Sequence, residues 1–176
     1  MRQLPPQAPK LSARAGQLQL HMIVRDATDA DAHTLAVVFT DAIRATDHSH
    51  YTPVQVEAWV AGANDPAAFG RRVLVNRTFI AEHGGEPVGF VSVAPDGHVA
   101  MLYVCGSSQG RGVGGRLLTV ALAAAVEAGA DRAYTEASVF SLPVFARAGF
   151  SEIGVESVEV RGVRFERWLM EKPLAL

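Results

Sequence analysis

The sequence predicts a mixed α+β (α/β) domain with a central twisted mixed sheet of about six or seven strands, flanked by helices. Its size and composition support one such domain, because 176 residues, 49% of them hydrophobic, can bury a core. Short apolar or alternating runs predict strands, and runs with apolar residues three and four apart predict helices. A glycine-rich segment over residues 109–116 separates one predicted strand from one predicted helix.

The N-terminal segment differs from the rest of the chain. Residues 1–21 hold three prolines and no hydrophobic periodicity, so we expect a flexible extension there. Residues 22–176 are expected to form the single domain.

Capping residues indicate where the first helices begin. Thr28 precedes two early acids, Thr52 opens a capping box with proline at the first helical position, and Asp65 precedes a further proline. The 133–137 strand should run parallel to the 98–104 strand, because a helix connects them. The remaining elements are expected as strands at 23–25, 78–82, 88–93, 98–104 and 133–137, helices at 112–128 and 142–148, and a hairpin of 153–160 with 163–170.

Charge and cysteine content exclude several classes of function. A formal net charge of −2 offers no basic field for nucleic acid, and no apolar run is long enough to span a membrane. The single cysteine, Cys105, excludes an intrachain disulfide and favours a cytoplasmic location. The pair His48 and His50 lacks the partners and spacing of a metal site, so we expect no metal.

The glycine-rich segment is the strongest functional signal. Glycine lets a ligand approach the backbone closely, and the free N–H groups at a helix start bind phosphate. We therefore expect a phosphorylated ligand, held mainly by main-chain amides. The segment reads Gln109-Gly110-Arg111-Gly112-Val113-Gly114-Gly115-Arg116.

One pattern that fits this segment belongs to dinucleotide-binding domains. Gly110, Gly112 and Gly115 match Gly-x-Gly-x-x-Gly, and Glu136 stands near the place of the acidic residue that should follow. That fold normally carries its fingerprint after the first strand, however, whereas four strands precede this segment.

The second pattern is Gln/Arg-x-x-Gly-x-Gly/Ala, which Gln109, Gly112 and Gly114 match. The stretch resembles the acetyl-CoA pyrophosphate loop of the GNAT N-acetyltransferase superfamily. The order of the predicted elements is similar to the GNAT fold, with a parallel strand pair at the acetyl-CoA site. The segment from Phe145 to Phe150 also resembles the aromatic-x₃-Gly-Phe signature of that family's last helix.

The resemblance implies transfer of an acetyl group from acetyl-CoA to a primary amine of a small molecule or peptide, by direct attack in a ternary complex. The loop amides would hold the pyrophosphate, and the preceding strand edge would bond the pantetheine. Either arginine of the loop could contact phosphate or lie in solvent. The residues then expected at acetyl-CoA are Leu102, Tyr103, Val104, Gln109, Gly110, Arg111, Gly112, Val113, Gly114, Gly115, Arg116, Ser141 and Phe145.

The sequence indicates the catalytic acid and base less clearly than it indicates the acetyl-CoA loop. Many relatives carry a tyrosine where Phe145 stands and a carboxylate where Ala100 stands. The remaining candidates are Glu136 as general base, with His98 and Ser138. Each has a structural alternative: a surface carboxylate, an exposed turn histidine and a helix cap.

The acceptor site is expected near His48, His50, Tyr51 and Trp59, where an aromatic and histidine wall suggests a small, partly apolar amine. Core packing is the alternative role for Trp59. Two other classes stay open, a CoA-binding module without catalysis and a dinucleotide-binding protein. Exposed sheet edges also allow a homodimer.

Overall fold

The computed structural model describes residues 22–46 and 49–175. The predicted extension over residues 1–21 and the acceptor-site candidate His48 lie outside the described residues. Within them, no helix is long and apolar enough to cross a membrane.

The predicted order of helices and strands is confirmed. Thr52 and Asp65 begin their helices as expected, since their side chains accept hydrogen bonds from the N–H groups of Gln55 and Ala68. The elements are β1 (Met22–Asp26), α2 (Ala32–Arg44), α3 (Pro53–Val60), α4 (Pro66–Val73), β2 (Arg77–His83), β3 (Glu86–Val93), β4 (Val99–Val104), α5 (Val113–Glu127), β5 (Arg132–Ala137), α6 (Leu142–Arg147), β6 (Ser151–Val160) and β7 (Val163–Pro173).

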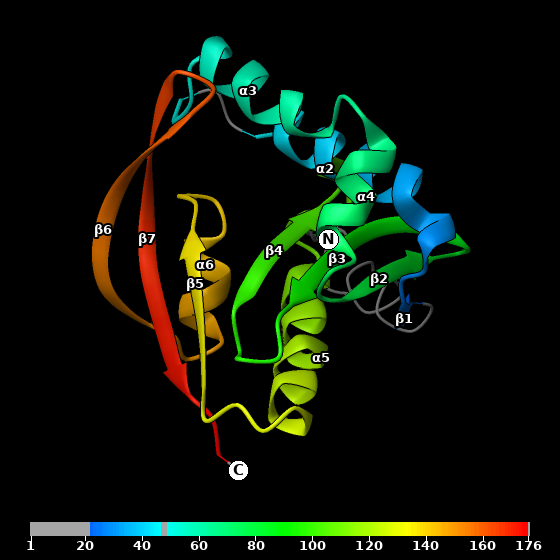
Figure 1. Ribbon diagram of the computed structural model, residues 1–176, viewed down its shortest axis with the longest axis vertical. Coiled ribbons are helices and arrows are strands. Elements are labelled where there is room, and N and C mark those ends of the chain that lie inside the picture. Colours follow the sequence, from blue (N-terminus) through cyan, green and yellow to red (C-terminus); the bar gives the residue numbers. More distant parts are fainter. Residues whose placement is uncertain (1–21, 47–48, 176) are drawn as a thin grey trace, which may run out of the picture.

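The strands form two hydrogen-bonded ladders that meet at one point. The first has the order β1-β2-β3-β4 and the second β5-β7-β6, and every pair within them is antiparallel. The predicted parallel pair is present as a single bridge, His98 opposite Tyr134, where the Tyr134 N–H donates to the Gly97 oxygen at 3.1 Å. Beyond this bridge β4 and β5 diverge (Figure 1).

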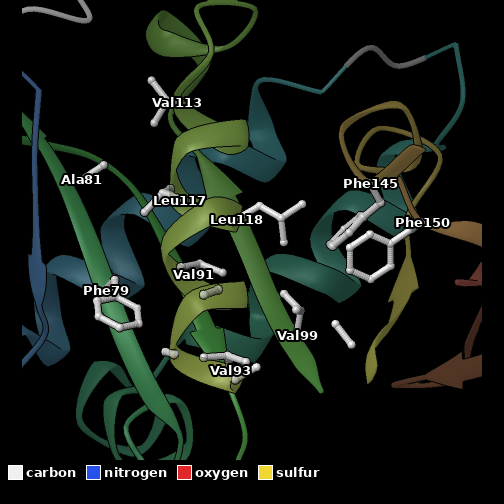
Figure 2. Packing of buried hydrophobic residues seen from close by; sticks show 14 of the residues in the cluster. Phe79, Ala81, Val91, Val93, Val99, Val113, Leu117, Leu118, Phe145 and Phe150 are labelled. Atoms are coloured by element: carbon white, nitrogen blue, oxygen red, sulfur yellow. The ribbon is translucent and has the colours of Figure 1, made fainter. Parts of the chain in front are cut away.

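Two hydrophobic clusters cover the two faces of the first ladder. On one face α5 packs Leu117 and Leu118, both fully buried, against Phe79 and Val91 (Figure 2). On the other face α2, α3 and α4 cover the second cluster, which includes Phe90. The alternation of Phe79, Ile80, Phe90 and Val91 between the clusters follows from the two-residue period of a strand.

Gly89 in β3 sets how closely α5 approaches the sheet. A Cβ at this position would lie 2.8 Å from the Tyr103 oxygen, 3.1 Å from Leu117 Cδ1 and 3.3 Å from Val113 Cγ1. The absence of a side chain here therefore brings the N-terminus of α5 against the end of β4.

Replacing Gly89 with alanine should lower the free energy of unfolding by about 1–3 kcal/mol, because backbone and helix must both shift. Urea denaturation measures this change. Gly154→Ala is the matched control, since its Cβ would make an ordinary 3.7 Å contact with Leu169 Cδ1. Equal losses in the two variants would contradict the close-approach argument.

Candidate active site

The divergence of β4 and β5 opens a cleft between the two ladders. Its volume is about 790 Å³, including the space open to solvent. One wall is the edge of β4, the opposite wall is the β5-β7-β6 sheet, and the two ends are formed by α6 and by the α3 region. The lining residues are Tyr51, Trp59, Val99, Ala100, Met101, Leu102, Tyr103, Thr135, Glu136, Ser138, Ser141, Phe145, Val158, Val160, Phe165, Glu166 and Arg167.

The edge of β4 that faces the cleft carries free main-chain donors. Cys105 donates its N–H to Val88 of β3 at 2.9 Å, and successive residues of an antiparallel strand face opposite edges. The N–H groups of Leu102 and Val104 therefore point away from β3, whereas Tyr103 bonds β3. The ladder slips by one residue at Ala100, as β-bulges beside active sites often do.

The glycine-rich segment follows the C-terminal end of β4, the end opposite the His98–Tyr134 bridge. The Gly106 N–H donates to Asp41 Oδ2 at 2.8 Å, which holds the loop to α2. Gln109 Nε2 donates to the Val104 oxygen at 3.0 Å, so this side chain joins the loop to the strand edge. Gly112 has a φ of 83°, a conformation that favours glycine, immediately before the first residue of α5.

The start of α5 has the properties of an anion site. The N–H groups of its first turn have no intrahelical acceptor, and the helix dipole adds positive charge there. The side chain of Val113 is buried and anchors this turn in the core. Arg111 and Arg116 are exposed beside it, together with Gly110 and Gly115.

Glu136 and His98 form a half-buried pair at the base of the cleft. His98 Nε2 lies 2.8 Å from Glu136 Oε2, and the imidazole stacks on Tyr134 with 4.8 Å between ring centroids. This hydrogen bond raises the pKa of His98 and lowers that of Glu136. The charge of Arg167 adds to the lowering of the Glu136 pKa and partly opposes the rise of the His98 pKa. Glu136 therefore favours its ionised form beside the His98 imidazole and the Arg167 guanidinium.

The N-terminus of α6 supplies hydroxyl groups and an aromatic ring. The Ser138 N–H donates to Ser141 Oγ at 2.9 Å, and the Ser141 N–H donates to Ser138 Oγ at 3.2 Å. Ser141 occupies the N-cap position of α6. Phe145 is buried and packs against Phe150 with 5.1 Å between centroids (Figure 2). It offers no hydroxyl to the cleft.

The opposite end of the cleft is aromatic. Trp59 lies edge-on to Tyr51 and Phe165, with centroids 5.4 and 5.9 Å apart. Its indole N–H donates to the Tyr103 hydroxyl at 3.2 Å. Burial raises the pKa of Tyr103 to about 12, so this hydroxyl stays protonated. His50 is exposed and contacts Phe140 instead.

The structure brings together eight of the residues predicted from the sequence, whereas Val104 and the loop residues 109–116 lie outside the lining. His98 contacts Glu136 without lining the cleft. Within the described residues, no three His, Cys, Asp or Glu side chains are grouped as for a metal ion. The eight lining residues are Tyr51, Trp59, Leu102, Tyr103, Glu136, Ser138, Ser141 and Phe145.

Sequence reasoning missed the contribution of the C-terminal hairpin. Val158 and Val160 of β6 and Phe165 and Arg167 of β7 all line the cleft. Their two-residue spacing is the signal that places each pair on one sheet face. Only the contact of β7 with α3 turns that face into a site wall.

Comparison with known proteins identifies the class to which this fold and cleft belong. The family model for the GNAT acetyltransferase domain matches residues 47–172. The chain therefore belongs to this family of acetyltransferases. Membership favours the GNAT interpretation of the glycine loop over the dinucleotide-binding one.

The chain resembles individual proteins along most of its length. It is 29% identical over 147 residues to the uncharacterized N-acetyltransferase YafP of Escherichia coli K12, covering 84% of this chain and 93% of YafP. A GCN5-related N-acetyltransferase from Rhodopseudomonas palustris superposes with a TM-score of 0.83 at 33% identity, covering 86% and 95% of the two chains. PaiA N-acetyltransferase from Thermoplasma acidophilum, in complex with coenzyme A, shares the fold with a TM-score of 0.68 at 17% identity, covering 87% and 99%.

Replacing Glu136 with glutamine should lower the pKa of His98 toward its ordinary value of 6.5, because the hydrogen bond that raises it loses its charge. Titration of the His98 ring protons by NMR measures this. The native pair should stabilise the fold fully between pH 4.5 and 6.5, the ordinary values of the two groups. This stability is lost as pH rises through the raised pKa of His98 or falls through the lowered pKa of Glu136. An unchanged His98 titration would contradict the pairing.

Proposed function

We propose that this protein transfers the acetyl group of acetyl-CoA to a primary amine of a small molecule or peptide, by direct attack in a ternary complex. One observation carries the proposal: the free edge of β4 runs from the start of α5, whose first-turn N–H groups are free to bind an anion, to a cleft lined by the Glu136 carboxylate. The coenzyme A bound by PaiA N-acetyltransferase, which shares this fold, supports the same ligand.

The donor would lie along β4. The amides from Gly110 to Gly115 would hold the pyrophosphate, with Arg111 and Arg116 near enough to pair with phosphate. The pantetheine would bond the strand edge like an added strand. The N–H of Leu102 or Val104 would then donate to the thioester oxygen and stabilise its negative charge in the transition state.

Glu136 and His98 would act together on the amine. The ammonium group of the acceptor must lose a proton before its nitrogen can attack the thioester carbon. Glu136 lines the cleft and would accept that proton, directly or through water. His98 is 29% exposed at its side chain, so it would pass the proton from Glu136 to solvent.

The rest of the reaction follows from the bonds made and broken. The amine nitrogen forms a bond to the carbonyl carbon, and the carbon–sulfur bond breaks to release the CoA thiolate. The thiolate takes a proton from water or from a hydroxyl, for which Ser138 and Ser141 are the nearest candidates at α6. Phe145 cannot supply it. The products are an amide and CoA.

Acetyl-CoA should bind with micromolar affinity, and Gly112→Asp should reduce binding below detection. The new carboxylate would repel the pyrophosphate at a backbone position that disfavours a side chain. Calorimetry measures both proteins. Gly129→Asp is the matched control, because Gly129 has a φ of 88° just beyond the other end of α5 and open space around it. Undetectable binding to the native protein at high concentration would refute the proposal.

Glu136→Gln should lower kcat by roughly 100-fold, the scale of a general base, while leaving acetyl-CoA affinity unchanged. Thiol release from acetyl-CoA, assayed with an amine panel, measures turnover. Glu152→Gln, at an exposed position of β6, is the control and should retain full activity. Full activity of Glu136→Gln would remove the assigned base. Binding of acetyl-CoA by the native protein without turnover of any amine would favour a CoA-binding module instead.

A further inference from the structure

The aromatic end of the cleft has no part in the proposed transfer chemistry. Tyr51 and Phe165 are each only 6% exposed, and Trp59 lies edge-on between them and Tyr103. The Trp59 N–H, its only polar group, is already bonded to the Tyr103 hydroxyl. This end therefore offers a ligand mainly apolar and aromatic surface.

The β6–β7 hairpin extends that apolar surface along the facing wall. Val158 and Val160 of β6 line the cleft beside Phe165 of β7. The register pairs Val158 directly with Phe165, so the two side chains stand on the same sheet face. The outer face of β6 carries Val155, which is 53% exposed.

The charges around the cleft are few and mostly paired. Its lining holds two carboxylates, Glu136 and Glu166, and one guanidinium, Arg167. Glu136 bonds His98, and Arg167 bonds Glu156 of the neighbouring strand. Glu166 is exposed, and its charge acts on Tyr51.

We propose that the acetyl acceptor is a primary monoamine whose amino group is carried on an arylalkyl or similarly apolar body. The inference rests on the proposed function. The amino group would lie at Glu136, and the body would lie between Trp59, Phe165 and Val158. Burying such a body removes apolar surface from water, which supplies the binding energy.

The same charges disfavour polycationic acceptors. A polyamine or an aminoglycoside brings further ammonium groups, which would lie beside the Arg167 cation and in apolar surroundings. Each such group placed among the aromatic side chains would lose hydration without gaining a partner there, because Glu166, the other carboxylate of the lining, is exposed to solvent. The Nε of Arg167 is itself buried and has no hydrogen-bond acceptor among the described residues. This wall would therefore be stabilised by a hydrogen-bond acceptor and destabilised by a second cation.

A matched set of amines tests the proposal with the native full-length protein. Phenethylamine and tryptamine represent the expected class, and putrescine, ethanolamine and an alanyl peptide represent the others. Phenethylamine should have a kcat/KM at least about 10-fold above that of putrescine, the scale of discrimination that an apolar pocket gives. Calorimetry of each amine with CoA-loaded protein provides a second readout that does not need turnover.

Val158→Glu should weaken or abolish the preference by adding a carboxylate at the apolar end. The ratio of kcat/KM for phenethylamine over putrescine should fall by about 10-fold or more. The new carboxylate would pair with the second ammonium group of putrescine, and the loss of the valine would remove apolar contact with phenethylamine. Val155→Glu adds the same charge on the outer face of β6 and should leave the ratio unchanged. Melting temperature and acetyl-CoA affinity show whether each variant is folded.

The outcomes separate the two proposals. Equal or better turnover of putrescine or of the peptide would overturn the acceptor class and leave acetyl transfer intact. Binding of phenethylamine to the CoA-loaded protein without thiol release from acetyl-CoA would overturn the transfer and support the pocket assignment. If phenethylamine and tryptamine are neither bound nor turned over, the acceptor class is overturned, whatever the variants do.

Discussion

The single parallel bridge between His98 and Tyr134 is the constraint on which the rest of the site depends. Each of the two strands is paired along its other edge, β4 with β3 and β5 with β7, so both stay in place without pairing to each other beyond this point. Leu102 and Val104 are consequently left with donors directed at a gap. Unpaired strand edges in folded proteins are usually blunted or covered. Here α3, α6 and the β6–β7 hairpin surround the gap without closing it, which is the arrangement expected where a ligand completes the ladder.

The same bridge also determines the electrostatics. It brings the ring of His98 onto Tyr134 and its Nε2 to Glu136, so the turn at Asp96 and the strand β5 form one network. A carboxylate with a lowered pKa is a weak base by itself, whereas an imidazole with a raised pKa holds a proton more readily near neutral pH. In the proposed transfer the pair would divide these tasks, because Glu136 lines the cleft and His98 is partly exposed to solvent. Neither property exists without the contact between β4 and β5.

Local signals in the sequence predicted the elements well, because their causes are local. Thr52 accepts from the third residue of its helix, and Gly112 adopts the positive φ that a glycine before a helix suggests. The order of elements then predicted the family fold. Other features depend on tertiary contacts that no local pattern encodes. Gln109 bonds the Val104 oxygen, and Arg167 stands in a cleft wall only because the hairpin packs against the α3 region. Residue spacing places these side chains on a face, but it does not indicate what that face meets.

The remaining polar groups near β4 favour direct transfer over an acyl-enzyme route. Burial raises the pKa of the Cys105 thiol to about 11, and the nearby Asp41 carboxylate disfavours the thiolate further. A cysteine nucleophile would need the opposite environment, a cation or a general base beside it. Tyr103 is likewise held neutral by burial and bonded to Trp59. Among the described residues no activated nucleophile lies beside the strand edge, so the proposed transfer would rely on orienting the thioester and removing the amine's proton. In the proposed transfer, holding both reactants in place would then be the main source of rate enhancement, and the shape of the aromatic end would bear on catalysis as much as on specificity.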